Sequence, residues 1–276
     1  MQQKRDQFLA LIAARSAIMG ILNVTPDSFS DGGKFQSHDA AVAHARRLTE
    51  AGADIIDVGA ESTRPGHVPV AEAEELARLK PLLADIVKAT PLPVSIDTSK
   101  AAVARAAIAD GVAVVNDVWG LQRDPAMADV VAAGGAAAVV MHNRETIDAE
   151  LDILSDMRRF FDRSLALAET AGIPRRHLIL DPGIGFGKTK DQNLTALRGL
   201  DHFKDYGLPI LVGVSRKSLF APILGAGVDE RMIGTIATNI IAAARGACIF
   251  RVHDVAEHVA AFKVFDAIER HPPGAS

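Results

Sequence analysis

The sequence contains almost no cysteine and no long apolar run, and each shortage excludes a class of protein. Cys248 is the single cysteine among 276 residues, which excludes an internal disulfide and a cysteine-built metal site. No stretch of about 18 consecutive apolar residues is present to span a membrane. The net charge of -4 lacks the basic excess that is typical of nucleic-acid binding. We expect a cytoplasmic protein that binds neither nucleic acid nor membrane.

Apolar material, by contrast, is plentiful. Hydrophobic residues make up 49% of the chain and charged residues 23%, which supplies a core large enough for a globular fold. The length fits two ordinary domains or one α/β barrel, since such barrels reach about 250 residues as a single unit. No Pro- or Ser-rich linker divides the chain. The order of the predicted elements therefore has to decide between two domains and one barrel.

Short aliphatic or β-branched runs alternate with Ala-rich segments of helical spacing along the whole chain. The eight predicted strands are Ile18–Asn23, Asp54–Val58, Pro93–Asp97, Ala113–Asp117, Ala137–Met141, His177–Asp181, Pro209–Val214 and Cys248–Val252. The eight predicted helices are Asp39–Ala51, Ala71–Ala89, Lys100–Ala109, Pro125–Ala133, Asp148–Ala171, Asn193–Asp205, Glu230–Arg245 and Val255–Ile268. Eight such units favour parallel strands in a closed barrel. We predict an α/β fold, a single-domain (β/α)8 TIM barrel over residues 1–276, with an N-terminal extension at 1–17 and a disordered tail at 271–276.

Polar residues stand where these strands end, and in a barrel the carboxyl ends of all strands meet at one mouth. Those that follow the eight strands in order are Asn23; Glu61 and Arg64; Asp97; Asn116 and Asp117; His142; Asp181; Ser215, Arg216 and Lys217; and Arg251, His253 and Asp254. For Asp117 and Asp254 a helix cap explains the residue type as well as a functional role does. A carboxylate or amide that ends an apolar strand, as at Asp97, Asn116 and Asp181, is costly to bury without a partner. These three predict a pocket that reads the donors of a planar heterocycle.

Three loops are long or rich in glycine. The polar loop 23–34 exceeds a simple turn and is interpreted as a mobile lid or, alternatively, as a solvated surface loop. The loop 61–67 carries Arg64, a cation that an anionic ligand could meet. The glycine-rich turn 181–189 allows close backbone approach to a flat ligand, with Phe186 as a wall.

Basic residues gather after the last two strands. Arg251 and His253 are two residues apart, so on an extended segment they face the same side. With Lys217 they supply the charge and donors that suit a diphosphate. Arg216 is adjacent to Lys217 and points elsewhere, so we assign it either to a structural ion pair or to the site.

The polar segments, taken together, match one family pattern. They are Asn23-Val-Thr-Pro-Asp-Ser-Phe-Ser-Asp-Gly-Gly33, Glu61-Ser-Thr-Arg-Pro-Gly66, Asp97, Asn116-Asp117, Asp181-Pro-Gly-Ile-Gly-Phe-Gly-Lys188, Ser215-Arg-Lys-Ser218 and Arg251-Val-His-Asp254. In these segments the chain resembles the dihydropteroate synthases, and the likeness extends from about Ile18 to Ile268. It implies a (β/α)8 barrel that condenses 6-hydroxymethyl-7,8-dihydropterin diphosphate with p-aminobenzoate and releases pyrophosphate. It also implies a sulfonamide target and a homodimer.

The resemblance implies roles for individual residues. The implied pterin-binding residues are Asp97, Asn116, Met141, Asp181, Phe186, Gly213 and Lys217. The implied diphosphate-binding residues are Asn23, Thr63, Arg64, Arg251 and His253, with Asn23 as ligand of a Mg2+ cofactor. The implied p-aminobenzoate-binding residues are Phe29, Thr63, Pro65, Lys217 and Ser218. The catalytic group would consist of Asp97, Asp181, Lys217, Arg251 and His253.

An electron-rich dihydropterin can stabilise a cation at its exocyclic methylene, so we expect diphosphate to leave before the weakly basic arylamine attacks. In this SN1-like scheme the carboxylates of Asp97 and Asp181 favour the developing positive charge. Mg2+, Arg251 and His253 stabilise the departing anion. The chain departs from the family pattern at Asn143–Asp148, where a Gly-Thr-Pro segment is frequent, and this leaves the conformation of that loop open.

Two other functions remain open. A pterin-dependent methyltransferase would have a similar barrel but no use for a diphosphate site, and a degenerate barrel would bind pterin without turnover. Assembly is also open, because apolar residues of the last two helices could face a partner or the barrel. They are Ile236, Ile240, Ile241, Phe262 and Phe265.

Overall fold

Eight parallel strands form a nearly closed barrel in the computed structural model, which describes residues 1–24, 34–61, 70–225, 227 and 229–269. The strands pair in the order β6-β5-β4-β3-β2-β1-β8-β7, and a bridge between Leu180 and Ile210 joins the two ends of that order. The strands are β1 (Ala17–Asn23), β2 (Ile55–Gly59), β3 (Val94–Asp97), β4 (Val114–Asp117), β5 (Ala137–Met141), β6 (Leu178–Asp181), β7 (Leu211–Val212) and β8 (Ile249–Val252).

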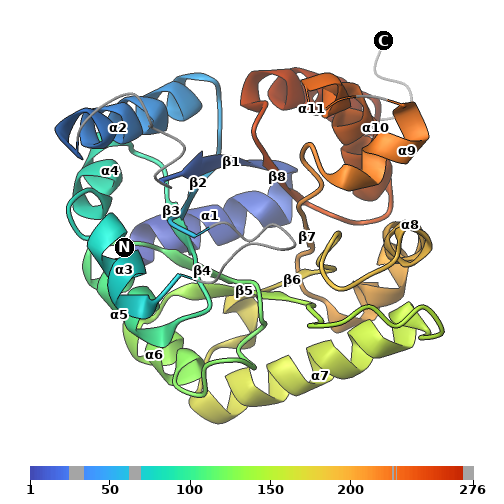
Figure 1. Cartoon of the computed structure of the whole chain (residues 1–276), viewed down its shortest axis with the longest axis horizontal. Helices are drawn as coiled ribbons and strands as arrows, with labels where there is room; N and C mark the ends of the chain where they lie inside the picture. The colour runs from blue at the N-terminus through green and yellow to red at the C-terminus, as the bar shows by residue number, and fades with distance from the viewer. Residues whose placement is uncertain (25–33, 62–69, 226, 228, 270–276) are drawn as a thin grey trace.

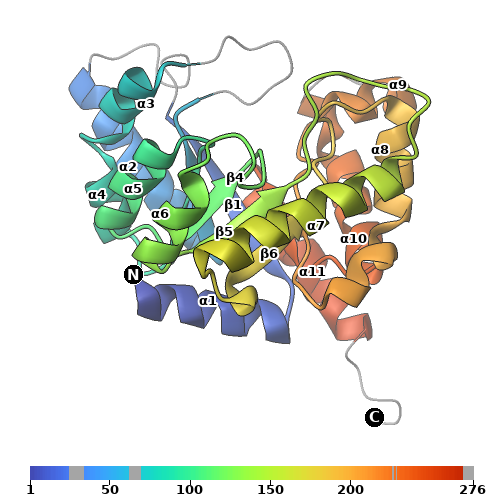
Figure 2. The same ribbon diagram turned by 90° about the horizontal axis from the view of Figure 1, so that it is seen from below.

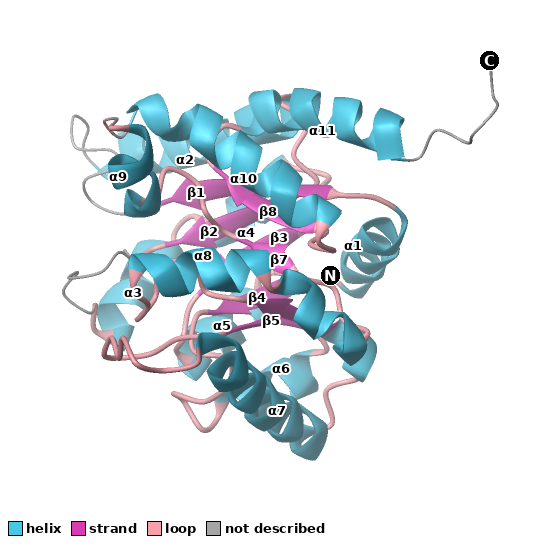
Figure 3. Ribbon diagram, turned by 90° about the vertical axis from the view of Figure 1, so that its right-hand side faces the viewer, coloured by secondary structure: helices cyan, strands magenta, loops and turns pink. Residues whose placement is uncertain are grey.

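Helices surround the strands on the outside of the barrel (Figures 1 and 3). The α-helices are α1 (Gln2–Ala14), α2 (Lys34–Glu50), α3 (Glu72–Leu79), α4 (Leu83–Ala89), α5 (Ala101–Ala109), α6 (Met127–Gly134), α7 (Ile153–Ala171), α8 (Lys190–Arg198), α9 (Ala221–Leu224), α10 (Met232–Ala244) and α11 (Val255–Glu269). The 3-10 helices are η2 (Arg175–His177), η3 (Leu200–Tyr206), η4 (Ser218–Phe220) and η5 (Asp229–Arg231). The predicted single-domain (β/α)8 barrel is confirmed. Within the described ranges, no helix is long and apolar enough to cross a membrane.

Several predicted elements have other bounds in the structure. The predicted helix 71–89 is two helices, α3 and α4, because Pro81 has no N–H to continue the helical hydrogen bonds. The predicted helix 148–171 begins later, as α7, because the Asp152 side chain caps its first turn at the backbone N–H groups of Leu154 and Ser155. The predicted helix 193–205 is interrupted by a glycine and continues as η3. Strand β7 is shorter than predicted.

The barrel interior changes from apolar to polar along its axis. Alternate residues of each strand point inward. The inward residues toward the amino ends are the buried apolar side chains Met19, Ile55, Val114, Val139, Ile179, Leu211 and Ile249. Those toward the carboxyl ends include the polar side chains Asp57, Asp97, Asn116, Asp181 and Arg251. This change places the candidate site at the carboxyl ends of the strands.

Helix α1 closes the opposite end of the barrel, where it lies across the strands (Figure 2). Its Phe8 and Ile12 pack against the inward apolar residues. Its Lys4 donates hydrogen bonds of 3.1 Å to the carbonyls of Thr90 and Leu92, just before β3. Most of the predicted N-terminal extension is therefore a helix that completes the core, while the predicted tail at 271–276 lies outside the described residues.

Candidate active site

One arginine connects the polar side chains at the mouth of the barrel. Arg251 in β8 donates from Nε to Asp57 Oδ2 at 2.6 Å and from Nη2 to Asp97 Oδ2 at 2.8 Å. Asp57 Oδ2 also accepts a hydrogen bond of 3.2 Å from Asn116 Nδ2. Strands β2, β3 and β4 are neighbours in the sheet, which brings the three partners together. Four side chains from four strands thus form one cluster.

Burial sets the protonation of this cluster. Asp97 is 5% exposed, and burial raises its pKa to about 7 although Arg251 acts in the opposite direction. Burial alone would lower the pKa of Arg251, but the carboxylates of Asp57 and Asp97 outweigh it, and the pKa lies above its ordinary value. The cluster therefore keeps a permanent cation beside a carboxyl group whose pKa burial raises.

A second group forms around Asp181 and Lys217. Asp181 Oδ1 accepts the backbone N–H of Gly183 at 2.7 Å, and burial raises the pKa of this carboxyl group despite that bond and the nearby Lys217. Lys217 Nζ donates to the carbonyl of Ile184 and stands 4.5 Å from the centre of the Phe186 ring. Burial lowers the pKa of Lys217 to about 8, while Asp181 acts in the opposite direction. A carboxylate, an ammonium group and an aromatic face together suit a flat ligand with donors and acceptors at its edge.

The glycine-rich turn after β6 packs directly against the segment after β5. A Cβ on Gly183, whose φ is +62°, would lie 1.9 Å from the carbonyl oxygen of His142. A Cβ on Gly187 would lie 2.4 Å from the carbonyl oxygen of Arg144. Lys188 is buried and donates to the carbonyls of His142 and Gly183 at 3.4 and 2.8 Å, and burial lowers its pKa to about 7. The turn that carries Phe186 is therefore held in place by the segment after β5.

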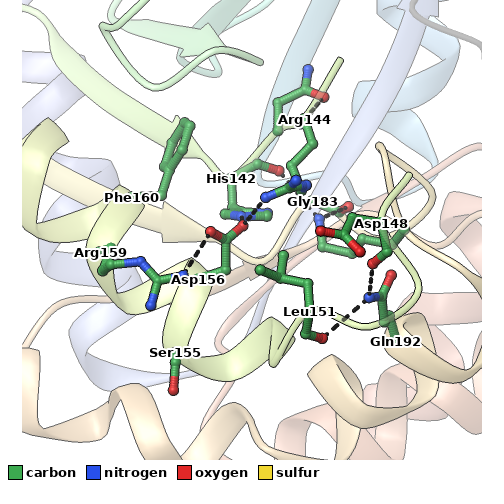
Figure 4. A network of polar contacts seen from close by, with 12 residues as sticks. His142, Arg144, Asp148, Leu151, Ser155, Asp156, Arg159, Phe160, Gly183 and Gln192 are labelled. Carbon is green, nitrogen blue, oxygen red and sulfur yellow. Dashed lines mark hydrogen bonds and ion pairs between the residues drawn. The ribbon is translucent and has the colours of Figure 1, made fainter. Parts of the chain in front are cut away.

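A polar network holds the segment after β5 to helix α7 (Figure 4). Asp156 of α7 accepts from Arg144 Nη1 at 2.7 Å and from Arg159 Nη2 at 3.1 Å, and lies 3.2 Å from His142 Nε2. Burial lowers the pKa of His142 to about 3, so its ring is neutral and donates to the carboxylate. Gln192 anchors the same segment through a 2.6 Å bond to the carbonyl of Asp148. The segment 143–148, which departs from the family pattern, is thus held by an ion pair and side-chain contacts.

Two contacts tie the segment after β7 to the segment after β8. Ser215 Oγ lies 2.9 Å from His253 Nδ1 and accepts the backbone N–H of His253 at 3.1 Å. Arg216 donates to both carboxylate oxygens of Asp254, at 3.1 and 2.5 Å. The structural ion pair weighed for Arg216 in the sequence is present, and Asp254 is its partner.

The predicted pterin-binding residues lie on neighbouring strands or the turns that follow them. At the ends of β3 to β8 the structure places Asp97, Asn116, Met141, Asp181, Phe186, Gly213, Lys217 and Arg251. Asn23 ends β1, and Ser218 is exposed at the start of η4. The remaining predicted residues Phe29, Thr63, Arg64 and Pro65 lie outside the described residues.

Sequence reasoning missed two residues. Asp57 is fully buried in β2 and holds Arg251 and Asn116, and its signal was a lone carboxylate inside the apolar run Ile55–Gly59. Lys188 was noted only as part of the glycine-rich turn, and nothing in the sequence separates a buried lysine from an exposed one.

Asn23 fits a hard cation. A Cβ on Gly59 would lie 3.7 Å from Asn23 Oδ1 and 3.6 Å from the Cβ of Asp97, so the absence of that side chain leaves space between them. Mg2+ prefers oxygen ligands, keeps several waters and is usually shared with substrate phosphates. In the part of the chain that is described, no group of three or more His, Cys, Asp or Glu could hold a metal by itself. A cation at Asn23 would need the oxygens of a bound diphosphate.

The chain is similar to known proteins over nearly its whole length. Residues 19–253 match the family model described as pterin binding enzyme. A dihydropteroate synthase of Clostridium beijerinckii is 47% identical over 94% of this chain and 96% of that protein, and one of Bacillus subtilis is 44% identical over 92% and 89%. The crystal structure of a Clostridium difficile dihydropteroate synthase in the presence of pteroic acid has a TM-score of 0.90 and 47% identity, covering 93% of this chain and 98% of that one. A Xanthomonas albilineans dihydropteroate synthase in complex with 7,8-dihydropteroate has a TM-score of 0.85 and 41% identity, covering 94% and 95%.

Proposed function

The chain belongs to the dihydropteroate synthase family of pterin-binding enzymes, and on this basis we propose that it joins 6-hydroxymethyl-7,8-dihydropterin diphosphate to p-aminobenzoate. The products are 7,8-dihydropteroate and pyrophosphate. The observation that carries the proposal is the set of buried Asp97, Asn116 and Asp181 with the half-buried Lys217 at the carboxyl ends of the strands. Carboxylates accept from the amino and ring N–H groups of a pterin, and a lysine donates to its carbonyl or ring nitrogen.

In the proposed reaction the bond between the exocyclic methylene carbon and the diphosphate oxygen breaks, and its electron pair leaves with the diphosphate. Asp97 and Asp181 stabilise the resulting dihydropterin cation. Arg251 and His253 stabilise the departing anion, and Arg251 Nη1 has no partner among the described residues. The amine nitrogen of p-aminobenzoate then forms the new C–N bond beside Lys217 and Ser218 and gives its proton to water or pyrophosphate, so no strong base is needed.

We also propose that Mg2+ accompanies the diphosphate. The support is the Asn23 amide oxygen and the space that Gly59 leaves beside it. When bound, the ion would neutralise part of the charge on the leaving group. Asn23 would orient the ion's complex, and Arg251 would bind the oxygens that the ion leaves uncovered.

The test is an assay of the purified chain with the dihydropterin diphosphate and Mg2+, with and without p-aminobenzoate and with a competing sulfonamide. We expect dihydropteroate and pyrophosphate in equal amounts, and the sulfonamide should inhibit. Lys217→Ala should lower the rate about a hundredfold, as loss of a group that stabilises charge does. Lys190→Ala, an exposed lysine at the start of α8, is the matched control and should retain the rate. Pterin binding without pyrophosphate release would point instead to a methyltransferase or a silent binding barrel.

A homodimer is a further proposal, supported by two exposed stripes on adjacent helices. Ile233, Ala237 and Ile241 recur every four residues on α10 and are exposed, as are Ala260, Val264 and Ile268 on α11. The two helices contact each other. Of the residues weighed in the sequence, Ile241 is exposed, whereas Phe262 is buried and Ile240 and Phe265 pack on the core. Paired aliphatic stripes of this kind suit a second copy of the chain.

The proposed location is the cytoplasm. Its support is the lone cysteine, whose side chain is half-buried, and desolvation raises the pKa of its thiol to about 11. A single cysteine forms no internal disulfide, which is typical of proteins in a reducing compartment. Cell fractionation with an antibody against the chain tests this directly, and recovery in a membrane or secreted fraction would contradict it.

A further inference from the structure

Asp57 is a fully buried carboxylate that stands deeper in the barrel than the groups proposed to meet the substrate. In the sheet register it pairs with Ser95, whereas Asp97 pairs with Gly59, so Asp57 lies one inward position below Asp97. Its Oδ2 accepts from both Asn116 and Arg251, at 3.2 and 2.6 Å. A buried acid without partners would be costly, and here it has two from distant parts of the chain.

The carboxylate dictates how the Asn116 amide is turned. Asp57 Oδ2 already accepts a hydrogen bond from Arg251 Nε, and Asn116 presents its NH2 group to the same oxygen. Its carbonyl oxygen Oδ1 then points away from Asp57. This Oδ1 is buried and has no partner in the part of the chain that is described. The side chain therefore offers an acceptor, and not a donor, to whatever occupies the site.

The same carboxylate also fixes the plane of the Arg251 guanidinium group. Nε is bound by Asp57 and Nη2 by Asp97, which are two contacts on one planar group. With both contacts made, the direction of the remaining Nη1 is set. Asp57 thus accepts side-chain hydrogen bonds both from Asn116, in the proposed pterin-binding part of the site, and from Arg251, in the proposed anion-binding part.

We propose that Asp57 is a positioning residue, which turns the Asn116 carbonyl oxygen toward an N–H donor of the dihydropterin and holds Arg251 toward the diphosphate. This inference rests on the proposed function and deepens it. A carboxylate is needed because an amide at position 57 could offer either end, and both orientations of Asn116 would then be populated. The chain thus selects a ring with a donor at this position before any ligand arrives.

The test is a double-mutant cycle on binding of 6-hydroxymethyl-7,8-dihydropterin, which lacks the diphosphate, measured by calorimetry. Asp57→Asn should weaken binding about tenfold, as expected for a misdirected hydrogen bond. In an Asn116→Ala background the same substitution should change the affinity less than about twofold, because its effect passes through Asn116. A role in folding alone would weaken binding by the same factor in both backgrounds and would overturn the proposal.

Ser95→Ala is the matched control, because Ser95 is buried at the same level and its hydroxyl forms no hydrogen bond with any described residue, Asn116 and Arg251 included. It should bind the dihydropterin as the wild type does. A folded Asp57→Asn variant with wild-type affinity would overturn the inference. Should that variant not fold, NMR of the wild type decides: the Asn116 NH2 protons should exchange slowly with water both before and after pterin is added, and fast exchange would contradict the proposal.

The two proposals fail in different ways. A wild-type chain that binds the dihydropterin but forms no dihydropteroate overturns the proposed reaction alone. A wild-type chain that binds no dihydropterin overturns both. Normal turnover without coupling between positions 57 and 116 overturns only the role of Asp57.

Discussion

At the scale of single residues, Ser215 controls one of the groups proposed to meet the diphosphate. Its Oγ accepts the backbone N–H of His253 at 3.1 Å and lies 2.9 Å from Nδ1 of the same residue. We propose that the hydroxyl donates its single proton to Nδ1, while one of its lone pairs accepts the backbone N–H. The neutral imidazole then carries its proton on Nε2, and which nitrogen holds the proton decides whether it can donate to an anion.

Ser215→Ala should therefore reduce kcat/KM for the dihydropterin diphosphate by about tenfold. Binding of the dihydropterin without diphosphate should not change, because the contact concerns the anion part of the site. Ser215→Thr keeps the hydroxyl and should restore most of the activity. Steady-state kinetics and calorimetry separate these effects, and equal losses for both ligands would argue against this role.

His142 should make the stability of the fold depend on pH. Burial lowers its folded pKa to about 3, well below the ordinary 6.5, so the stability it contributes is present above pH 6.5 and declines as the pH falls toward 3. Between pH 6.5 and 5 the unfolded chain takes up a proton that the folded chain refuses, which costs about 2 kcal/mol. Urea unfolding of wild type and His142→Gln at both pH values measures this.

In that comparison the wild type should lose more unfolding free energy between pH 6.5 and pH 5 than His142→Gln does. His202→Gln, at an exposed position, is the control and should follow the wild type. Parallel pH profiles for wild type and His142→Gln would show that the buried ring is not the source.

The sequence indicated which polar residues belong to the candidate site more readily than it indicated which of them contact each other. Asp97, Asn116 and Asp181 stood out because each ends an apolar strand, where only a partner or a ligand makes burial tolerable. Asp57 was overlooked because its partner Arg251 is 194 residues away in the chain. Which buried charges meet across a barrel depends on strand register, and periodicity carries no register between distant strands.

At the scale of elements, the turn after β6 is built around close backbone contacts. Gly183 and Gly207 have nearly the same φ, +62° and +63°, yet a Cβ would collide with the carbonyl of His142 at Gly183 and meet nothing within 4 Å at Gly207. Alanine substitutions at these two glycines therefore separate the cost of a left-handed backbone, which both would have, from the cost of a collision with the neighbouring backbone, which only Gly183 would have. The contact matters because this turn carries Ile184 and Phe186, which hold Lys217.

Gly207→Ala should lower the free energy of unfolding by about 1 kcal/mol, the cost of the left-handed conformation alone. Gly183→Ala should cost at least about 2 kcal/mol more, because backbone atoms have to move apart. It should also weaken dihydropterin binding, whereas Gly207→Ala should not. Chemical denaturation and calorimetry test this. Equal effects of the two substitutions would contradict the proposed role of the close contact between the turn after β6 and the segment after β5.

The positions of the strands were predictable, whereas helix interruptions were less so. Apolar runs bounded by polar residues located all eight strands within a few residues, because buried parallel strands need continuous apolar sequence. The predicted helix 71–89 ignored Pro81, although proline is a strong helix breaker. The closing role of α1 could not be seen, because its few buried residues face a barrel end that only the assembled strands create.

At the scale of the whole molecule, the exposed stripes on α10 and α11 are expected to decide the oligomeric state. Ile241→Asp places a charge within the exposed stripe of α10 and should convert the proposed dimer to a monomer. Ile147→Asp is the matched control, because Ile147 is 61% exposed but lies on the segment after β5. Sedimentation velocity distinguishes the two outcomes. A wild-type chain that sediments as a monomer would contradict the proposal.

The closure of the barrel also has a consequence for the order of events during synthesis. Strand β1 pairs on one side with β2 and on the other with β8, which follows it by more than two hundred residues. While the ribosome is still translating the middle of the chain, one edge of β1 has no partner strand. The barrel end that α1 closes has not yet formed. The earliest segments to emerge are thus the last to reach their final environment. A nascent chain of this kind depends on the tempo of translation and on chaperones to keep that open edge from pairing with another molecule.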